Sequence, residues 1–445
     1  MKRIAIVGSG VVGINCLLRL IDERDLDTQI VWVYDSKTPI FGIGESTTPD
    51  LPSQISLSTN LVNPHIKKYF DATIKFGNKF IGWGKKHNFI RWLDPHAVGI
   101  HFDTKYFSEF FIEHIPKMTP NLELRDEKIT HMGFDVDGVH VNNQKYDFVI
   151  DCTGGKSLID HDYYFDSAFV STNTALALRL PQPADWGVTI TYAHRNGWMF
   201  GIPLQSRRTF GYTYNSNVTT EEEAVKDFRS IIPEALGYPY KKFSWTPRLS
   251  KYILHHSGRY ARNGNAVGFL DPLESLAGHY YDRISDRICE FALNCDYNNQ
   301  DKINEMNDWY YDSVVDKWYK NMAWMYHFGS KYDSPFWRNM VADSRDLLNN
   351  KEINFYGILG ENQNFTDDFF HIIGDNPKMV QDFVYHKIHD YLDGDLHNFA
   401  GNYRDFVEFA YGMGADYAHK FPLLVPHMDL REEWGELHFD TMSLK

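Results

Sequence analysis

The pattern of apolar residues near the N-terminus predicts a strand, a helix and a second strand in close succession. Residues 3–7 form a short apolar run, and apolar residues then recur with helical spacing between residues 11 and 21. A second apolar run covers residues 29–34 and ends at Asp35. This order of elements is typical of a βαβ unit, so we expect an α/β fold.

Further along the chain, short apolar runs bounded by turn residues predict more strands. Residues 146–151 form one such run, and residues 171–214 consist of several short β-like segments, which indicates an antiparallel sheet. A strand and a turn are also expected between residues 264 and 273, where small and apolar residues gather.

Helical signals become frequent in the second half of the chain. Thr220 and Glu223 have the spacing of a capping box, which predicts a helix that ends before Pro233. Residues 294–307 are rich in Asn and Asp and are expected to form a linker. Apolar residues recur with helical spacing from residue 308 onward.

The composition excludes several classes of protein. The chain has 445 residues, with 45 Lys and Arg against 59 Asp and Glu, and this net charge of −14 argues against a nucleic-acid partner. A hydrophobic content of 43 % excludes a disordered chain, and no apolar run approaches the length of a membrane span. The N-terminus reads as a strand rather than a signal peptide, and the four cysteines include no CxxC pair. We therefore expect a cytoplasmic globular protein with no membrane partner.

A glycine-rich segment between the first strand and the first helix is the first motif that carries chemistry. It reads Gly8-Ser9-Gly10-Val11-Val12-Gly13, in which the glycines permit a tight turn, close approach to a pyrophosphate and close helix packing. Asp35 follows 22 residues after Gly13, and an acid at this place hydrogen-bonds an adenosine ribose. The motif predicts a dinucleotide site and leaves NAD and FAD both open.

Two later motifs suit contacts to the same dinucleotide. Asp151-Cys152-Thr153-Gly154 does not belong to a P-loop, because the glycine that such a loop needs five residues before Gly155 is Ile150. The small residues from Gly264 to Gly278 let the backbone pass close to a flat cofactor, and the turn at Pro272 is expected to start a helix whose N–H groups face an anion or a flavin carbonyl. Taken in order, the three motifs resemble the FAD signature of aromatic-hydroxylase-type flavoproteins.

Further segments are similar to those of the flavin-dependent tryptophan halogenase family. Gly42-Ile43-Gly44-Glu45-Ser46-Thr47-Thr48-Pro49 resembles the flavin-contacting segment of that family. Asp71–Trp83 is similar to the stretch with its catalytic lysine, and Pro272–Ser275 to the stretch with its catalytic glutamate. Other segments that fit are residues 151–159 and 327–337. The resemblance spans roughly residues 3 to 340, and the short viral members are the subgroup that the chain is expected to resemble.

The resemblance implies a two-component enzyme. Reduced FAD from a separate flavin reductase reacts with O2 to give a flavin hydroperoxide, which oxidises a halide anion to hypohalous acid. Lys75 and Glu274 are the implied catalytic residues, which deliver the halogen to a small, electron-rich aromatic substrate such as an indole or a phenol. The implied cofactor contacts are Gly8, Gly10, Val11, Val12, Gly13, Asp35, Gly44, Glu45, Ser46, Thr47, Asp151, Thr153, Gly154, Phe269, Leu270 and Gly278.

The chain departs from the family pattern in two places. The W-x-W-x-I-P motif, which is associated with keeping substrate away from the flavin, has Phe200 in place of its second Trp, and the bulk of Phe200 is expected to preserve the barrier. The implied barrier residues are Trp198, Phe200 and Pro203. The halide site, where the family reads Ser-Thr-Gly, consists here of Ser275, Leu276 and Ala277 followed by Gly278. The lost hydroxyl predicts that bromide or iodide is used better than chloride.

Other interpretations of the same residues remain open. The chain could be an FAD-dependent aromatic monooxygenase, or a flavin-binding scaffold without catalysis. Without the resemblance, Lys75 would be read as a surface lysine, and Glu274 as an acid favoured by the first turn of a helix. His386 and His389 could share a helix face, but no third ligand has a recognisable spacing, so no metal site is expected.

The expected architecture combines a Rossmann-like FAD-binding domain of the aromatic-hydroxylase type with an antiparallel-sheet substrate region and a C-terminal helical region. The expected FAD-binding halogenase module covers residues 1–300, with Rossmann segments 1–60, 140–160 and 250–293 and inserted substrate segments 61–139 and 161–249. Residues 301–445 are expected to form a mainly helical substrate-binding region. A homo-oligomer, the native substrate and the regiochemistry remain open.

Overall fold

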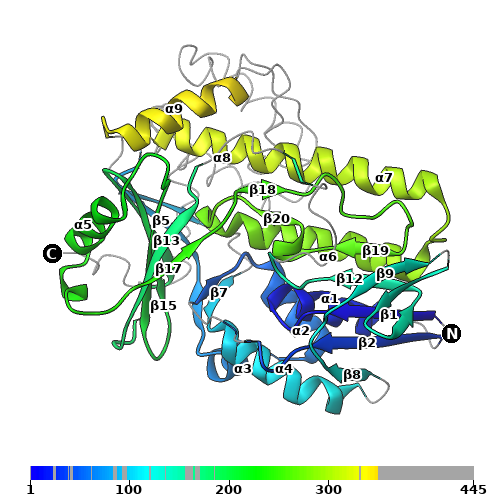
Figure 1. Ribbon diagram of the computed structural model, residues 1–445. Coiled ribbons are helices and arrows are strands. Elements are labelled where there is room, and N and C mark those ends of the chain that lie inside the picture. Colours follow the sequence, from blue (N-terminus) through cyan, green and yellow to red (C-terminus); the bar gives the residue numbers. More distant parts are fainter. Residues whose placement is uncertain are drawn as a thin grey trace, which may run out of the picture. The chain divides into compact units, whose positions relative to one another are not determined.

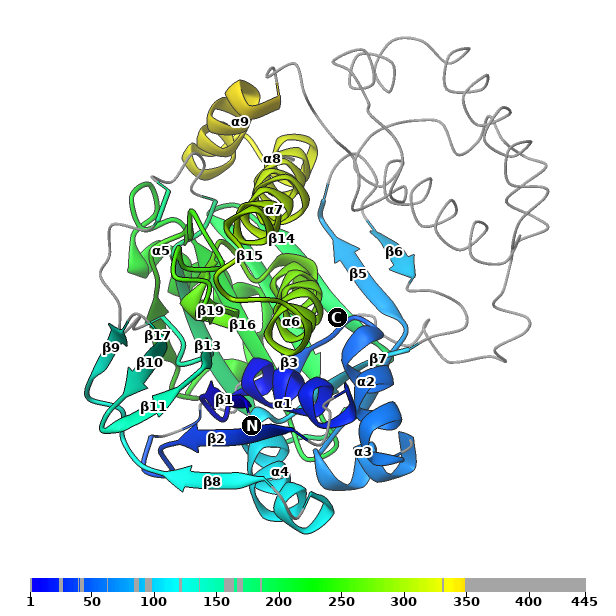
Figure 2. The ribbon, with the colours of Figure 1, turned by 90° about the vertical axis from the view of Figure 1, so that its right-hand side faces the viewer.

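A five-stranded parallel sheet contains the N-terminus in the computed structural model of the chain (Figures 1 and 2). In spatial order its strands are β19 (Tyr260–Arg262), β12 (Phe148–Asp151), β1 (Lys2–Val7), β2 (Thr28–Tyr34) and β8 (Glu123–Asp126). The helix α1 (Val11–Glu23) joins β1 to β2, which confirms the predicted βαβ unit. The structure describes residues 2–23, 27–38, 40, 44–61, 63–83, 88–92, 98–119, 122–135, 137–155, 164–165, 171–184, 186–329 and 332–348.

The parallel sheet is buried because its strands are almost entirely apolar. Ile4 to Val7 in β1 and Ile30 to Val33 in β2 are inaccessible to solvent. Strands covered on both faces read as continuous apolar runs, which is the pattern of residues 3–7 and 29–34. Helix α1 packs against α6 (Leu276–Asn294), and Arg19 of α1 forms ion pairs with Asp282 and Asp286 of α6. The sheet and these two helices form the frame of the predicted dinucleotide site.

The chain folds as two compact units, each assembled from separate stretches of sequence. Unit 1 consists of Met1–Thr73, Ile100–Ser167 and Thr246–Asp316, and unit 2 of Ile74–Gly99, Ala168–Trp245 and Lys317–Lys445. The sequence-based division at residue 300 is a different partition and stays a prediction.

A seven-stranded sheet forms the centre of unit 2. In spatial order its strands are β17 (Lys241–Ser244), β13 (Thr174–Leu180), β16 (Arg208–Tyr214), β15 (Gly197–Pro203), β14 (Val188–His194), β5 (Gly77–Ile81) and β6 (Asn88–Trp92). The four strands from β13 to β16 are joined in antiparallel fashion, as residues 171–214 predicted. The pair of β14 and β5 is parallel, so the sheet as a whole is mixed.

Helix α5 (Glu221–Ile231) covers one face of this sheet (Figure 1). Phe228 and Ile231 of α5 pack with Leu176, Met199 and Tyr212 of the strands. The predicted capping box is confirmed, because the Thr220 hydroxyl accepts from the Glu223 N–H while the Glu223 carboxylate accepts from the Thr220 N–H. The helix ends before Pro233, as expected.

The predicted linker at residues 294–307 is wrong. Helix α6 continues to Asn294, and α7 (Gln300–Tyr310) starts only a few residues later. Asn299 caps α7, since its side chain accepts a hydrogen bond from the N–H of Lys302. The Asn-rich composition therefore reflects helix capping, a task for which Asn is strongly preferred.

The apolar run at residues 146–151 also divides differently from the prediction. Tyr146 ends β11 (Gln144–Tyr146), and the buried strand β12 begins at Phe148. The intervening Asp147 accepts a hydrogen bond from the N–H of Arg3, which ties the break to β1. A second small sheet joins β11 to β10 (Gly138–Val141) and β9 (Met132–Asp135).

The remaining elements connect these sheets. In unit 1 they are β3 (Glu45–Ser46), α2 (Asp50–Thr59), α3 (Asn63–Tyr69), α4 (Thr104–Met118), β18 (Arg248–Leu249) and β20 (Gly268–Phe269), together with β7 (Gly99–Phe102) from Ile100 onward. The strand β4 (Thr73–Lys75) crosses the boundary between the units, and α8 (Asp316–Gly329) and α9 (Pro335–Leu348) follow α7. The predicted helical region is present as far as residue 348 and lies outside the described residues beyond it.

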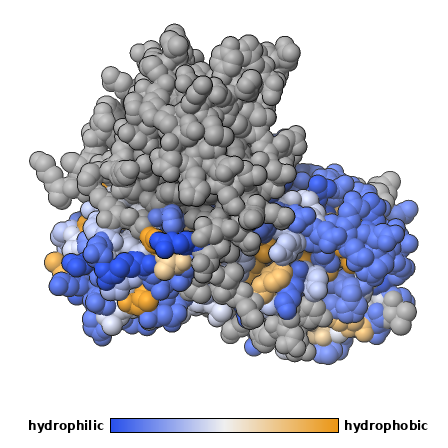
Figure 3. Space-filling model, turned by 90° about the horizontal axis from the view of Figure 1, so that it is seen from above, coloured by the Kyte–Doolittle hydropathy of each residue, from blue (hydrophilic) through white to orange (hydrophobic). Residues whose placement is uncertain are grey.

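The described part of the face in Figure 3 is largely hydrophilic, with scattered apolar groups. Single apolar residues on a surface are ordinary for a protein in contact with water. Among the helices in the described ranges, none is long and apolar enough to span a bilayer.

Candidate active site

The glycine turn after β1 is held by close backbone contacts. Gly8 has a φ of +119°, and a Cβ at Gly8 would lie 2.5 Å from the carbonyl oxygen of Cys152. A Cβ at Gly13 would lie 2.3 Å from the carbonyl oxygen of Gly8. Both distances are far inside van der Waals contact, so these two glycines are required by the packing of the turn itself.

Three other glycines of unit 1 border open space. Among the described residues, and apart from chain neighbours and a helix's own backbone, no heavy atom lies within 4 Å of the Cβ position at Gly10, Gly154 or Gly278. Gly155, which the sequence reasoning did not select, is equally open, and only its place beside Gly154 could have indicated it. Backbone that carries no side chain and faces open space fits the close approach of a dinucleotide.

The second and third motifs meet around the Asp151 carboxylate. Asp151 is buried, and its side chain accepts hydrogen bonds from the N–H of Thr153 at 2.9 Å and from the Tyr260 hydroxyl at 2.6 Å. The backbone N–H of Asn263 donates to the carbonyl of Asp151. Val12 packs beside Gly264, where a Cβ would lie 3.2 Å from the valine methyl. Tyr260 and Asn263 support the motifs from β19 and the following turn, and the sequence reasoning missed both.

Asp35 stands directly after β2, where the sequence places the ribose contact. Its carboxylate accepts hydrogen bonds from the N–H of Lys37 and from the Thr38 hydroxyl, both at 2.9 Å. The turn thus fixes the carboxylate at the carboxyl end of a parallel strand, which is the edge where such sheets bind ligands.

The segment that resembles the flavin-contacting stretch is described from Gly44 onward, and Gly42 and Ile43 lie outside the described residues. Glu45 and Ser46 form the strand β3, which pairs with β7. The N–H of Thr47 donates to the carbonyl of Ile100, and the N–H of Ile100 donates to the Thr47 hydroxyl at 2.9 Å. Desolvation and the nearby Asp103 carboxylate raise the pKa of Glu45 to about 7.

An ion pair connects this segment to the start of α6. The Asp50 carboxylate lies 3.6 Å from Nδ1 of His279 and accepts from the Thr48 hydroxyl at 2.8 Å. Burial alone would raise the pKa of Asp50, but hydrogen bonding and the charge of His279 outweigh it and lower the pKa. His279 directly follows the predicted halide segment and carried no motif of its own.

Glu274 and Ser275 adopt left-handed backbone conformations, with φ values of 58° and 62°. A short 3-10 turn over Leu273–Ser275 follows Pro272 and leads into α6 at Leu276, so the expected turn and helix are present. The alternative interpretation of Glu274 as an acid in the first turn of that helix is wrong, because Glu274 precedes α6 and is not helical. Glu274 is only 8 % exposed. Left-handed non-glycine residues cost roughly 1–3 kcal/mol each and cluster at functional sites. The turn that precedes α6 thus determines the position of the Glu274 carboxylate.

The predicted halide residues Ser275, Leu276 and Ala277 are half-buried at this junction, and Gly278 is exposed. Phe269 ends β20, and Leu270 is buried behind it. Tyr281 in α6 donates its hydroxyl hydrogen bonds to the Gly268 carbonyl at 2.6 Å and the Asn265 side chain at 2.9 Å. Helix α6 and the preceding strand are therefore joined directly at the candidate site.

Lys75 is fully buried at the end of β4. Lysine is almost never fully buried in proteins unless its charge is compensated, so the interpretation of Lys75 as a surface lysine is wrong. Lys75 belongs to unit 2, and Glu274 belongs to unit 1.

The predicted barrier residues share one strand of unit 2. Trp198, Phe200 and Pro203 all lie on β15, and Trp198 is inaccessible to solvent. Trp83 packs against Trp198, Tyr326 and Trp337, with ring centroids 6.2, 6.0 and 5.3 Å away. The sequence reasoning missed Tyr326, because a tyrosine at helical spacing carries no sign of its partner.

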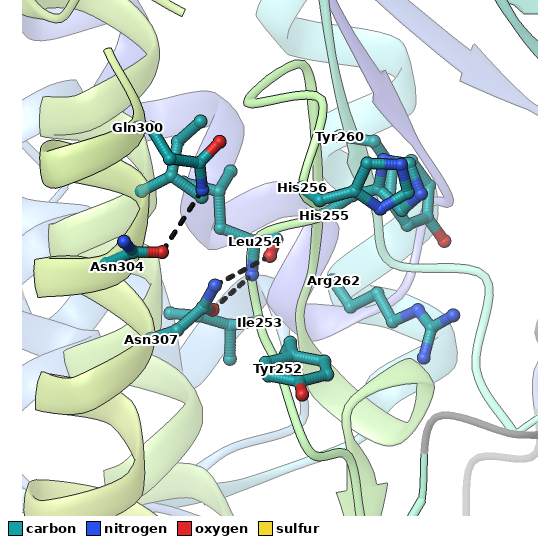
Figure 4. Close-up of a pocket in the computed structure, with 11 residues that line it drawn as sticks. Tyr252, Ile253, Leu254, His255, His256, Tyr260, Arg262, Gln300, Asn304 and Asn307 are labelled. Carbon is teal, nitrogen blue, oxygen red and sulfur yellow. Dashed lines mark hydrogen bonds between the residues drawn. The ribbon is translucent and has the colours of Figure 1, made fainter. Parts of the chain in front are cut away.

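A cavity of about 310 Å³ lies elsewhere in unit 1, between residues 252–262 and α7 (Figure 4). The Asn307 side chain hydrogen-bonds both the N–H and the carbonyl of Leu254, and Gln300 donates to Asn304. The Asn307 amide ties the segment to the helix, whereas the bond between Gln300 and Asn304 lies within α7. No predicted site residue lines the cavity. Among the described residues, no group of three His, Cys, Asp or Glu could hold a metal ion, and His386 and His389 lie outside them.

The chain is similar to known proteins both in sequence and in fold. The chain matches the family model described as tryptophan halogenase over residues 3–121 and 97–373. It is 21 % identical over 469 aligned residues to tryptophan 6-halogenase ThaL of Streptomyces albogriseolus, an alignment that covers 83 % of this chain and 84 % of that protein. It is 26 % identical over 212 residues to tryptophan 7-halogenase RebH of Lentzea aerocolonigenes, but this covers only 43 % of the chain and 37 % of RebH.

A solved tryptophan halogenase of Shewanella frigidimarina matches with a TM-score of 0.70 at 16 % identity. That match covers 97 % of this chain and 94 % of the other. At this identity the likeness establishes the fold, a Rossmann-like α/β region followed by helices.

Proposed function

Because the chain belongs to the tryptophan halogenase family, we propose that it is a halogenase that uses reduced FAD to halogenate a small, electron-rich aromatic substrate. Enzymes of this family are flavin-dependent and take reduced flavin from a separate reductase. The observation that carries the proposal is the complete burial of Lys75, the residue that matches the catalytic lysine of the family.

The three open glycines Gly10, Gly154 and Gly278, which we call the glycine cradle, fit the cofactor. Gly10, Gly154 and Gly278 would let FAD approach the backbone, and the N-terminus of α1 would face its diphosphate. Asp35 would hold the adenosine ribose through its fixed carboxylate. When bound, the reduced flavin would activate O2, and O2 would supply the oxidising equivalents that turn halide into an electrophilic halogen species.

Lys75 and Glu274 have complementary tasks in this proposal. The Lys75 ammonium offers three hydrogen-bond donors, with which it can hold hypohalous acid against the aromatic ring. In the substitution, the ring carbon gains the halogen and loses a proton, and the hydroxyl of the acid leaves as water with a proton from the Lys75 ammonium. Glu274 takes up the ring proton as a general base, and its left-handed turn keeps the carboxylate in place.

The halide segment supports a preference among halides. Leu276 and Ala277 offer no hydroxyl where the family has one, so a small, strongly hydrated anion loses a hydrogen-bond partner. Bromide and iodide are easier to oxidise and need a less confined site. We propose that both are used better than chloride.

Mass detection of products tests the function directly. The protein is supplied with FAD, a flavin reductase, NADH and O2. It is offered indole, tryptophan or a phenol with chloride, bromide or iodide in turn. The proposal predicts halogenated products, with chloride the slowest. A hydroxylated product without halide would identify a monooxygenase instead, and equal rates with all halides would remove the halide preference.

Two variants separate catalysis from cofactor binding. Lys75→Met and Glu274→Gln should lower halogenation by at least about 100-fold, the usual contribution of a proton-transfer group, while FAD affinity stays unchanged. Lys68→Met is the matched control, because Lys68 is an exposed lysine of α3. Full activity in Lys75→Met would exclude the assigned role.

A further inference from the structure

The two barrier rings lie on the same face of β15. Trp198 and Phe200 are two residues apart in a strand, and their ring centroids are 6.3 Å apart. Met199, between them, points to the opposite face and packs with the core under α5. The barrier face of the sheet is thus distinct from the face that α5 covers.

The Trp198 ring is fixed by a hydrogen bond from a distant part of the sequence. Its Nε1–H donates to the Tyr326 hydroxyl of α8 at 2.7 Å. Both side chains are inaccessible to solvent. A buried indole N–H needs an acceptor, so removal of the hydroxyl would leave this N–H unsatisfied.

Phe200 lies over a glycine on the neighbouring strand. Phe200 pairs with Gly211 of β16, and a Cβ at Gly211 would lie only 2.1 Å from Cζ of the phenylalanine ring. Any side chain at position 211 would therefore displace the ring. Because Gly211 has no side chain, the Phe200 ring can pack flat against the sheet, where it extends less far from the sheet than a tryptophan ring that projects outward.

We propose that Tyr326 and Gly211 are positioning residues that fix Trp198 and Phe200 and so control how much hypohalous acid escapes before it reaches the substrate. This inference rests on the proposed function and on the family resemblance that makes Trp198 and Phe200 barrier residues. The hydrogen bond to Tyr326 fixes the orientation of the Trp198 indole ring. The absence of a side chain at Gly211 allows the Phe200 ring to pack against the backbone of β16. Movement of either ring would open the barrier without touching Lys75.

A spectroscopic test examines whether Tyr326 fixes the Trp198 ring, and it requires no enzymatic turnover. The protein is labelled with 5-fluorotryptophan, and the Trp198 resonance in the ¹⁹F NMR spectrum is assigned with Trp198→Phe. Tyr326→Phe removes only the hydroxyl and should shift or broaden the Trp198 resonance. Tyr214→Phe is the control, because Tyr214 is a buried tyrosine in the core on the opposite face of the same sheet. An unchanged Trp198 resonance in Tyr326→Phe would overturn the inference, whether or not the chain halogenates any substrate.

A second test measures escape during turnover. Free hypohalous acid is trapped by a soluble thioether, and the ratio of trapped acid to halogenated product is compared among variants. Loss of one hydrogen bond should raise this ratio about two- to tenfold in Tyr326→Phe. Gly211→Ala should raise it too, and Tyr214→Phe should match the parent. A lower rate with an unchanged ratio would assign Tyr326 a purely structural role and overturn the inference, and absence of halogenation in the parent would refute the proposed function alone.

Discussion

Gly10 and Gly13 stand three residues apart in the same turn but meet different surroundings. The Cβ position at Gly10 is open, whereas at Gly13 it overlaps the carbonyl oxygen of Gly8. We predict that Gly10→Ala leaves the free energy of unfolding unchanged or raises it by up to about 1 kcal/mol, because alanine restricts the unfolded chain. The same variant should weaken FAD binding about tenfold, since the added methyl occupies the space for the pyrophosphate.

Gly13→Ala is the matched comparison, and it should lower the stability of the fold rather than act directly on FAD affinity. The overlap at 2.3 Å should lower the free energy of unfolding by about 1–3 kcal/mol, as overpacking generally does. Urea unfolding gives the stability, and quenching of flavin fluorescence gives the affinity. If Gly10→Ala destabilised the fold while it kept full FAD affinity, the open cradle would not be the cofactor site.

Asp227 joins two elements of unit 2, the helix α5 and the turn between β14 and β15. Its carboxylate accepts from the Tyr212 hydroxyl at 2.9 Å and from both the backbone and side-chain nitrogens of Asn196. Nδ1 of His194 lies 3.0 Å away. Burial alone would raise the pKa of Asp227, but His194 and the other donors outweigh it and lower the pKa.

This depressed pKa makes the contribution of Asp227 to stability depend on pH. A carboxyl with a lowered folded pKa stabilises the protein above its unfolded pKa of about 3.9, and the effect is lost as the pH falls through the lower folded value. Asp227→Asn should cost about 1–3 kcal/mol at pH 7, and the difference from the parent should shrink below about pH 4. Urea unfolding at several pH values measures it, with the exposed Asp312→Asn as control. A difference that is constant down to the acid limit would contradict the prediction.

At the scale of single elements, sequence patterns predicted a helix start or a turn correctly where residues close in sequence determine it. The capping box of Thr220 and Glu223 and the glycine turn depend on residues a few positions apart, and both are present. Asn299, which caps α7, was misread as part of a linker, because composition does not distinguish a cap from a loop. The left-handed turn at Glu274 could not be predicted, since non-glycine residues such as Glu and Ser rarely adopt this conformation.

Contacts between distant stretches determine the rest of the candidate site. Trp198 and Tyr326 are separated by 128 positions, and no local pattern connects them. The burial of Lys75 likewise follows from the packing around β4, whereas the surrounding sequence contains three other lysines within eight positions and reads as a surface. Resemblance to the family identified the residue, and the fold explains its burial.

At the scale of the whole molecule, the division into two units predicts where FAD should stabilise the chain. The cradle glycines, Asp35 and the Asp151 network all belong to unit 1, although they come from three separate stretches of sequence. A ligand at 100 times its dissociation constant stabilises the state that binds it by about 2.7 kcal/mol. Hydrogen exchange with and without FAD should therefore slow most in β1, α1, β12 and β19. Strands β13 and β17, at the far edge of the unit 2 sheet from β5, are the internal control. Protection in β13 and β17 equal to that in β1 would mean that both units open together, and would refute the assignment of the cofactor cradle to unit 1 alone.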